Sequence, residues 1–93
     1  MSEPSLEFEP NNRSLFVLAD RVLYAFTKGT DESIIPLRGI TDVVVNGGFG
    51  RTLAIKQRYG RTIATGYDKD RQSQVEAFAE QIRSAARAHG APV

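Results

Sequence analysis

The feature that most restricts the fold of this chain is a series of short apolar segments separated by turn residues. Between Leu6 and Tyr67 these segments alternate with clusters of Gly, Pro, Asn and Asp, which is the pattern of consecutive antiparallel strands. After Tyr67 the apolar residues recur about every 3.6 positions, the period of an amphipathic helix. This order predicts a mainly β domain, a seven-stranded antiparallel barrel or pair of bent sheets, closed by one C-terminal helix.

The second and third apolar segments are apolar at nearly every position, so both faces of each strand are apolar. Only Asp20 and Arg21 separate them, and a two-residue break permits only a tight antiparallel hairpin. In the fourth segment Pro36 lacks a backbone donor, which favours a sheet edge or a bend. The first five expected strands are Leu6 to Glu9, Ser14 to Ala19, Val22 to Thr27, Ser33 to Leu37 and Ile40 to Asn46.

The sixth and seventh strands are predicted from an echo in the sequence, because Gly-Arg-Thr-Leu-Ala-Ile from residue 50 recurs as Gly-Arg-Thr-Ile-Ala-Thr from residue 60. We interpret the two runs as the arms of one hairpin. A three-residue loop over 58–60, with Gly60 in the left-handed conformation, places Gln57 opposite Arg61 and Ile55 opposite Ile63. Slipping this register by one residue would divide the apolar face between the two sides of the sheet.

A helix is predicted over residues 71–89. Asp68 or Asp70 could cap its start, and Ser73 could do so as part of a capping box, so three starts remain open. Gly90 and Pro92 end it. Its apolar stripe, expected to dock on the sheets, consists of Val75, Phe78, Ala79, Ile82, Ala85 and Ala86.

The composition indicates one ordered domain spanning residues 1–93, with residues 1–4 and 90–93 as loose termini. The chain has 93 residues, of which 41% are hydrophobic and 25% charged. It has no cysteine, so neither disulfides nor thiolate metal sites can form. The N-terminus lacks the apolar core of a signal peptide, and no apolar run approaches the ~20 residues that span a bilayer. We therefore expect a cytoplasmic, soluble protein.

The order of elements resembles the pleckstrin-homology fold, and the details are similar to the bacterial pleckstrin-homology-like domains. The resemblance covers residues 14–87. It rests on Leu-x-Asp-Arg-x-Leu-Tyr from Leu18, Ile-Pro-Leu-x-x-Ile-x-x-Val from Ile35, Leu-x-Ile from Leu53, the Tyr59-Gly60 pair, and Phe-x-x-x-Ile from Phe78. It implies two bent antiparallel sheets plugged by a helix. It implies no single ligand, because members bind lipids, peptides or one another.

The loop between the first two expected strands departs from the lipid-binding members of that family, which carry several basic residues there. This chain has Arg13 alone, just after Glu7 and Glu9. One arginine beside two carboxylates is a poor site for a phosphate group. The loop therefore argues against phosphoinositide binding.

No residue pattern predicts catalysis, a cofactor or a metal. His89 is the only histidine, and it falls in the last turn of the predicted helix, where a cation suits the helix dipole. No serine lies in a nucleophile motif, and no histidine cluster exists. The sequence therefore predicts a protein that is not an enzyme.

Two segments are candidates for binding. The glycine-rich loop over 46–51 could form an anion nest, or a plain hairpin in which Phe49 either folds back or anchors a partner. The stretch from Val43 to Tyr67 has four basic and no acidic residues, which predicts either a contact for anions or a solvated strand face. The candidate binding residues are Arg13, Phe49, Arg51, Lys56, Arg58, Tyr59 and Arg61.

Two functions are compatible with these features. The first is an interaction module that binds protein, including a second copy of itself, through sheet edges and loops, since the first strand is acidic and the last two are basic. The alternative is a peripheral binder of anionic surfaces, lipid headgroups before nucleic acid, through the basic hairpin. The balanced net charge of +1 argues against nucleic acid as the partner.

Overall fold

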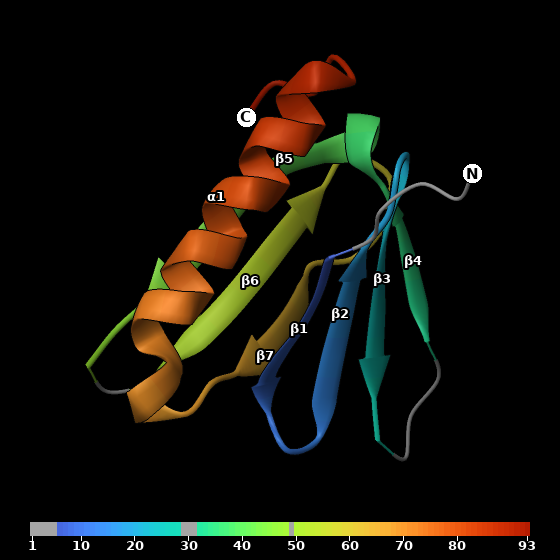
Figure 1. Cartoon of the computed structure of the whole chain (residues 1–93). Helices are drawn as coiled ribbons and strands as arrows, with labels where there is room; N and C mark the ends of the chain where they lie inside the picture. The colour runs from blue at the N-terminus through green and yellow to red at the C-terminus, as the bar shows by residue number, and fades with distance from the viewer. Residues whose placement is uncertain (1–5, 29–31, 49) are drawn as a thin grey trace.

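The computed structural model describes residues 6–28, 32–48 and 50–93, which form two antiparallel sheets and one C-terminal helix. The helix runs diagonally along one side of the sheets (Figure 1). Two single-turn 3₁₀ helices, η1 and η2, precede β5 and α1. The elements are β1 (Leu6–Asn11), β2 (Ser14–Leu18), β3 (Val22–Thr27), β4 (Ser33–Pro36), η1 (Leu37–Gly39), β5 (Ile40–Asn46), β6 (Thr52–Gln57), β7 (Ile63–Gly66), η2 (Lys69–Arg71) and α1 (Gln72–Ala88).

The predicted fold class is confirmed, with strand order β1-β2-β3-β4 in one sheet and β5-β6-β7 in the other. The sheets are not closed into a barrel. Between β1 and β7 the side chain of Asn11 donates hydrogen bonds to Thr65 and to the carbonyl of Gly66, where a ladder would otherwise run. The chain after β7 also turns toward the helix, and Arg71 Nη1 donates to the Glu9 carbonyl at 2.7 Å. Strand β7 ends at Gly66 without a backbone ladder to β1.

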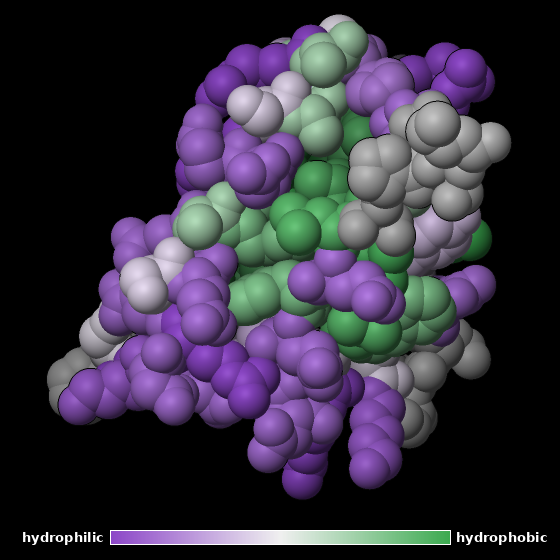
Figure 2. Space-filling model, in the orientation of Figure 1, coloured by the Kyte–Doolittle hydropathy of each residue, from purple (hydrophilic) through white to green (hydrophobic). Residues whose placement is uncertain are grey.

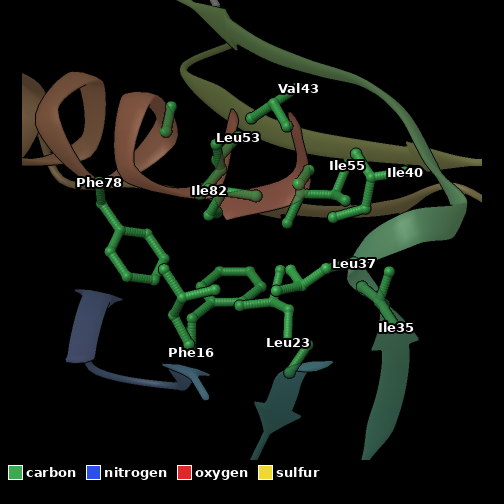
Figure 3. Packing of buried hydrophobic residues seen from close by; sticks show 14 of the residues in the cluster. Phe16, Leu23, Ile35, Leu37, Ile40, Val43, Leu53, Ile55, Phe78 and Ile82 are labelled. Carbon is green, nitrogen blue, oxygen red and sulfur yellow. The ribbon is translucent and has the colours of Figure 1, made fainter. Parts of the chain in front are cut away.

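The core lies between the inner faces of the two sheets and the apolar stripe of α1 (Figure 3). The buried positions of β2 and β6 alternate with less buried ones, as strand geometry requires. Phe78 and Ile82 of the helix are 3% and 0% exposed. The ring of Phe78 lies 5.0 Å from that of Phe8 and 6.1 Å from that of Phe16. The helix thus plugs the open side of the two sheets, as predicted.

The predicted register of the β6–β7 hairpin is confirmed, because Ile55 pairs with Ile63. Gly60 has a φ of 140°, a value that favours glycine. Gln57 Nε2 donates to the Arg61 carbonyl at 3.0 Å, which braces the loop from within. Strand β1 continues past the predicted end to Asn11, because Pro10 is buried at an irregularity in its pairing with β2.

The helix begins within one residue of the predicted start, but none of the predicted caps is formed. No side chain caps α1: Arg71 occupies its N-cap position without a side-chain cap bond, and Asp68 forms an ion pair with Arg71 at 3.5 Å. The η2 turn supplies the first hydrogen bonds in place of a capping side chain. Among the described residues, no helix is long and apolar enough to cross a membrane.

The end of the helix is more ordered than predicted. Gly90 has a φ of 87°, and the N–H groups of Gly90 and Ala91 donate to the carbonyls of Arg87 and Ala86. These two bonds form a Schellman motif. Ala91 is 8% exposed and Val93 packs against the core, so residues 90–93 are not a loose terminus. Residues 1–4, the other terminus predicted to be loose, lie outside the described residues.

Candidate functional site

The outer face of the β1–β4 sheet is apolar, although it does not face the core. Val17, Tyr24 and Ile34 are paired in one row across three strands. Further rows pair Leu15 with Phe26 and Val22 with Pro36. Since directly paired residues lie on the same face of a sheet, these side chains form one surface. We call it the apolar face: Leu15, Val17, Val22, Tyr24, Phe26, Ile34 and Pro36.

The apolar face is open to solvent in the described part of the chain. Ile34 is 54% exposed, Pro36 is exposed and the other five are half-buried by their neighbours in the sheet. None of the seven belongs to the core or packs against it. The rings of Tyr24 and Phe26 stack with centroids 6.2 Å apart. The face is three strands wide, at about 4.8 Å per strand, and about five residues long, at about 3.3 Å per residue. Its footprint is therefore roughly 240 Å².

The outer face of the β5–β7 sheet has a different composition. Its central row consists of Val44, Ala54 and Ala64, and its neighbouring row pairs Asp42 with Lys56. Small and charged side chains of this kind are typical of a sheet face in contact with water. The apolar face is therefore a property of one sheet and not of the fold as a whole.

Acidic side chains lie along one edge of the apolar face. Glu7 pairs with Val17, so its carboxylate is on the same side of the sheet as the apolar row. Glu9 follows on the same strand, and both glutamates line a hollow of about 260 Å³ with Phe8 and Leu15. Both carboxylates are exposed.

Cationic side chains lie at another corner of the same face, where two neighbouring hollows share Pro36, Arg38 and His89. The first, of about 490 Å³, is also lined by Arg21 and Val22. The second, of about 430 Å³, is also lined by the hairpin residues Gln57, Arg58 and Tyr59. Among the residues that the structure describes, no acidic side chain lines either hollow. Asp20 forms an ion pair with Arg21 at 3.7 Å, so Arg38 and Arg58 supply most of the local positive charge.

The predicted basic stretch does not form one site. Arg51 precedes β6 and Arg58 follows it, so the seven steps of extended chain from one to the other separate them by about 23 Å. Lys56 lies opposite Asp42, which offsets its charge. Arg61 is exposed in the hairpin loop beside Tyr59, whose side chain is 85% exposed.

The remaining sequence candidates lie elsewhere. Arg13 is in the β1–β2 turn, where its carbonyl accepts a bond from the N–H of Lys28 at 2.7 Å. Two basic residues thus lie at that end of the sheet, and the sequence analysis identified only one of them. Phe49 lies outside the described residues. Its neighbours Gly48 and Gly50 have φ values of 68° and 72°.

Arg38 was missed by sequence reasoning because its position depends on how the two sheets meet. It lies in η1, the connection from β4 to β5, and the Arg58 N–H donates to the Gly39 carbonyl at 2.8 Å. That bond brings η1 against the β6–β7 hairpin. The apolar face had a sequence signal, because the segments that became β2 and β3 are apolar on both sides.

A second apolar surface lies between α1 and β1, where Figure 2 shows apolar atoms gathered beside the polar side of the helix. It is a groove of about 270 Å³ lined by Leu6, Phe8, Ala77 and Phe78 among others. Leu6 is 42% exposed. The groove borders the core, because Phe78 also lines it.

Metal ligands are not gathered in the described ranges, which contain no group of three or more His, Asp or Glu side chains arranged around a common point. His89 lies at the C-cap of α1 and lines the cationic hollows. Comparison of the chain with models of protein families, with curated proteins and with solved structures gives no match.

Proposed function

We propose that this chain is a non-enzymatic, pleckstrin-homology-like interaction module that binds a protein partner on its apolar face. The observation that carries the proposal is the open row of Val17, Tyr24 and Ile34, with Ile34 54% exposed. The largest apolar patch on a typical monomer covers about 300–600 Å² and is often functional, and the apolar face approaches that size. The aromatic pair Tyr24 and Phe26 adds the residue types that are enriched at the centre of interfaces.

The order of elements supports the family assignment. A four-stranded and a three-stranded antiparallel sheet followed by one helix is the arrangement that the resemblance implies. Function in such a scaffold resides in its surfaces, because the fold itself accommodates many ligands. The described residues offer an apolar surface with charged borders, which suits binding and supplies no acid–base pair.

The face, and not the sheet edges, is the proposed contact. The backbone N–H of Leu37 donates to the Arg21 carbonyl, so the backbone groups of Leu37 point toward β3. Because these groups point to opposite sides at successive residues of a strand, those of Ile34 and Pro36 point outward from the edge of β4. Pro36 has no N–H, so little of that edge can pair. On β5, Arg83 Nη2 already binds the carbonyl of Val43 at 2.7 Å. Both edges are therefore partly protected against strand addition.

Site-specific photo-crosslinking tests the proposal. A benzophenone amino acid at position 24 replaces one aromatic side chain with another on the apolar face. The control carries it at position 64, an exposed position on the outer face of the other sheet. In cells that naturally contain the protein, we expect protein adducts at position 24 and few at position 64. Equal yields at the two positions, or no protein adduct at position 24, would refute the proposal.

Binding of phosphate-bearing surfaces is the second candidate function, and the two cationic hollows favour it. Arg38 lines both and Arg58 lines the second, with no acidic side chain among their described lining residues, and arginine forks bind phosphate in a bidentate manner. Flotation with anionic liposomes at about 0.1 M salt tests it, because screening at that ionic strength spares only near contacts. Binding should be lost in Arg38→Glu plus Arg58→Glu and retained in Arg51→Glu. Equal loss in both variants would place the contact elsewhere.

A further inference from the structure

We infer that the tip of the β6–β7 hairpin docks on an anionic lipid surface, with the ring of Tyr59 inserted among the lipids and arginines bound to the headgroup phosphates. This inference rests on the second candidate function and names both its ligand and the residue that enters the membrane. The hairpin tip consists of Arg58, Tyr59, Gly60 and Arg61. It is distinct from the β1–β2 turn, which carries Arg13.

Tyr59 is held out in solvent by a braced loop. It is 85% exposed, more than any other large hydrophobic side chain in the described ranges. The Gln57 side chain donates to the Arg61 carbonyl at 3.0 Å, and the Arg58 N–H donates to the Gly39 carbonyl at 2.8 Å. These bonds fix the chain on both sides of Tyr59. An exposed tyrosine adds little to the core, but its ring and hydroxyl suit the boundary between lipid headgroups and acyl chains.

Three arginines surround this ring. Arg58 and Arg61 flank it in sequence, and Arg38 lines the same hollow of about 430 Å³ as Arg58 and Tyr59. All three arginines are exposed. The volume of the hollow lies in the range of about 300–1,000 Å³ that is usual for small-ligand sites. A headgroup phosphate that enters it therefore meets Arg38 and Arg58 while Tyr59 lies at its border.

The negative groups closest to this surface are already engaged. Asp42 pairs across the strands with Lys56 on the outer face of the β5–β7 sheet. The last turn of α1 meets the hollow through His89, and the carbonyls of Ala86 and Arg87 in that turn accept N–H groups at distances of 2.9–3.0 Å. Neither the carboxylate nor the helix end is therefore free to oppose a bound phosphate.

A lipid surface fits these features better than a strand of nucleic acid does. Proteins that bind single strands stack successive bases on several aromatic side chains along a groove. Tyr59 is the only Phe, Tyr or Trp among the described residues that line the two cationic hollows. The net charge of +1 also gives little long-range attraction for a polyanion. One exposed tyrosine beside basic residues is the composition of a membrane-interface contact.

The contributions of the individual residues can be separated by flotation with anionic vesicles. A basic residue near an anionic leaflet contributes ~1 kcal/mol, which is about five-fold in affinity. Arg58→Gln and Arg61→Gln should each weaken binding about five-fold, whereas Arg51→Gln, beyond the other end of β6, should leave it unchanged. Tyr59→Ser should weaken binding about five-fold or more, because burial of about 40 Å² of the ring already contributes ~1 kcal/mol.

Tryptophan fluorescence tests the insertion itself. The chain has no tryptophan, so Tyr59→Trp places a single reporter at the hairpin tip. The vesicles contain about 30% phosphatidylserine at about 0.1 M salt. We expect the emission to shift to shorter wavelength, and lipids brominated near the headgroup end of their acyl chains should quench it. Ser73→Trp is the matched control, exposed at the start of α1 and about 24 Å along the helix from His89, and it should show neither effect.

Flotation of the same samples separates the inference from the function on which it rests. If the chain floats but the emission of Tyr59→Trp shifts no more than that of Ser73→Trp, the insertion is wrong and phosphate binding stands. If only the Tyr59→Trp variant fails to float, the insertion is also wrong, since Trp suits the membrane interface as Tyr does. If the unmodified chain does not float, both are wrong.

A single-stranded oligonucleotide in place of the vesicles checks the other class of partner. A shift in the emission of Tyr59→Trp with the oligonucleotide, and none with the vesicles, would overturn the inference and assign the hairpin tip to nucleic acid. Circular dichroism of each variant establishes that it is folded.

Discussion

Truncation of Phe78 is the sharpest test of the helix as the plug of this fold. Phe78 is 3% exposed and contacts the rings of Phe8 and Phe16. Removing a buried phenylalanine costs about 3–5 kcal/mol, because transfer energy is lost and a cavity is left. A domain of 93 residues at roughly 0.05–0.15 kcal/mol per residue has a total stability of about 5–14 kcal/mol. Phe78→Ala should therefore remove at least about a fifth of the free energy of unfolding.

Urea denaturation followed by circular dichroism measures this loss. With a slope of roughly 1.5 kcal/mol per M, the midpoint of Phe78→Ala should fall by about 2–3 M. Phe78→Leu, which keeps most of the volume, should fall by less and remains measurable if the alanine variant is unfolded. Gln81→Ala, at an exposed position of the same helix, is the control and should change the free energy by about 0.5 kcal/mol or less. Equal midpoints for Phe78→Ala and Gln81→Ala would refute the plug.

Three further perturbations follow from local geometry, and each can be read from the same denaturation curves. Gly60→Ala should destabilise the fold by roughly 1 kcal/mol or more because φ at this position is 140°. Gly60→Asn should be no more stable than Gly60→Ala, since Asn tolerates φ near +60° and not 140°. Gly39→Ala is the control, because a Cβ at Gly39 would meet no atom within 4 Å. Arg83→Met should cost about 1 kcal/mol by removing the 2.7 Å bond to a carbonyl of β5. Tyr67→Phe should cost about 0.5–1.5 kcal/mol, because the Tyr67 hydroxyl donates to the last carbonyl of β5 at 2.7 Å.

The strands were predictable where two independent constraints agreed. The predicted bounds of Val22 to Thr27 and Ile40 to Asn46 match β3 and β5. In the β6–β7 hairpin, the apolar alternation and the need for glycine at position 60 both selected the pairing of Ile55 with Ile63. A one-residue slip would have violated both constraints, so the register had one solution.

The cap of the helix was not predictable because several residues satisfied the same local rule. Asp68, Asp70 and Ser73 are all acceptable N-caps by residue type, yet none of them caps α1. Asp68 pairs with Arg71 instead, and Arg71 also reaches the Glu9 carbonyl. The conformation of the first helical turn is therefore set by a contact with β1, since Arg71 and Glu9 are 62 residues apart in sequence. No local sequence pattern contains such a contact.

The positions of the charged residues were hidden for a related reason. Arg51, Lys56, Arg58 and Arg61 are neighbours in sequence, but β6 is extended and carries its two ends apart. Arg38 is 20 residues from Arg58 in the chain and lies beside it because η1 hydrogen-bonds to the hairpin. A cluster in the sequence of an extended strand is therefore a poor guide to a cluster in space.

The apolar face, in contrast, was encoded in the sequence in a form that the fold alone does not explain. In β6 and β7 larger side chains face the core, and small or polar side chains such as Thr52, Ala54, Lys56 and Ala64 lie on the outer face. In β2 and β3 this alternation is missing, although their outer positions Leu15, Val17, Tyr24 and Phe26 add nothing to the core. These positions are half-buried, and cross-strand pairs such as Val17 with Tyr24 contribute roughly 0.2–1 kcal/mol each. Packing of the core alone thus gives no reason for this face, and the protein partner proposed above would supply one.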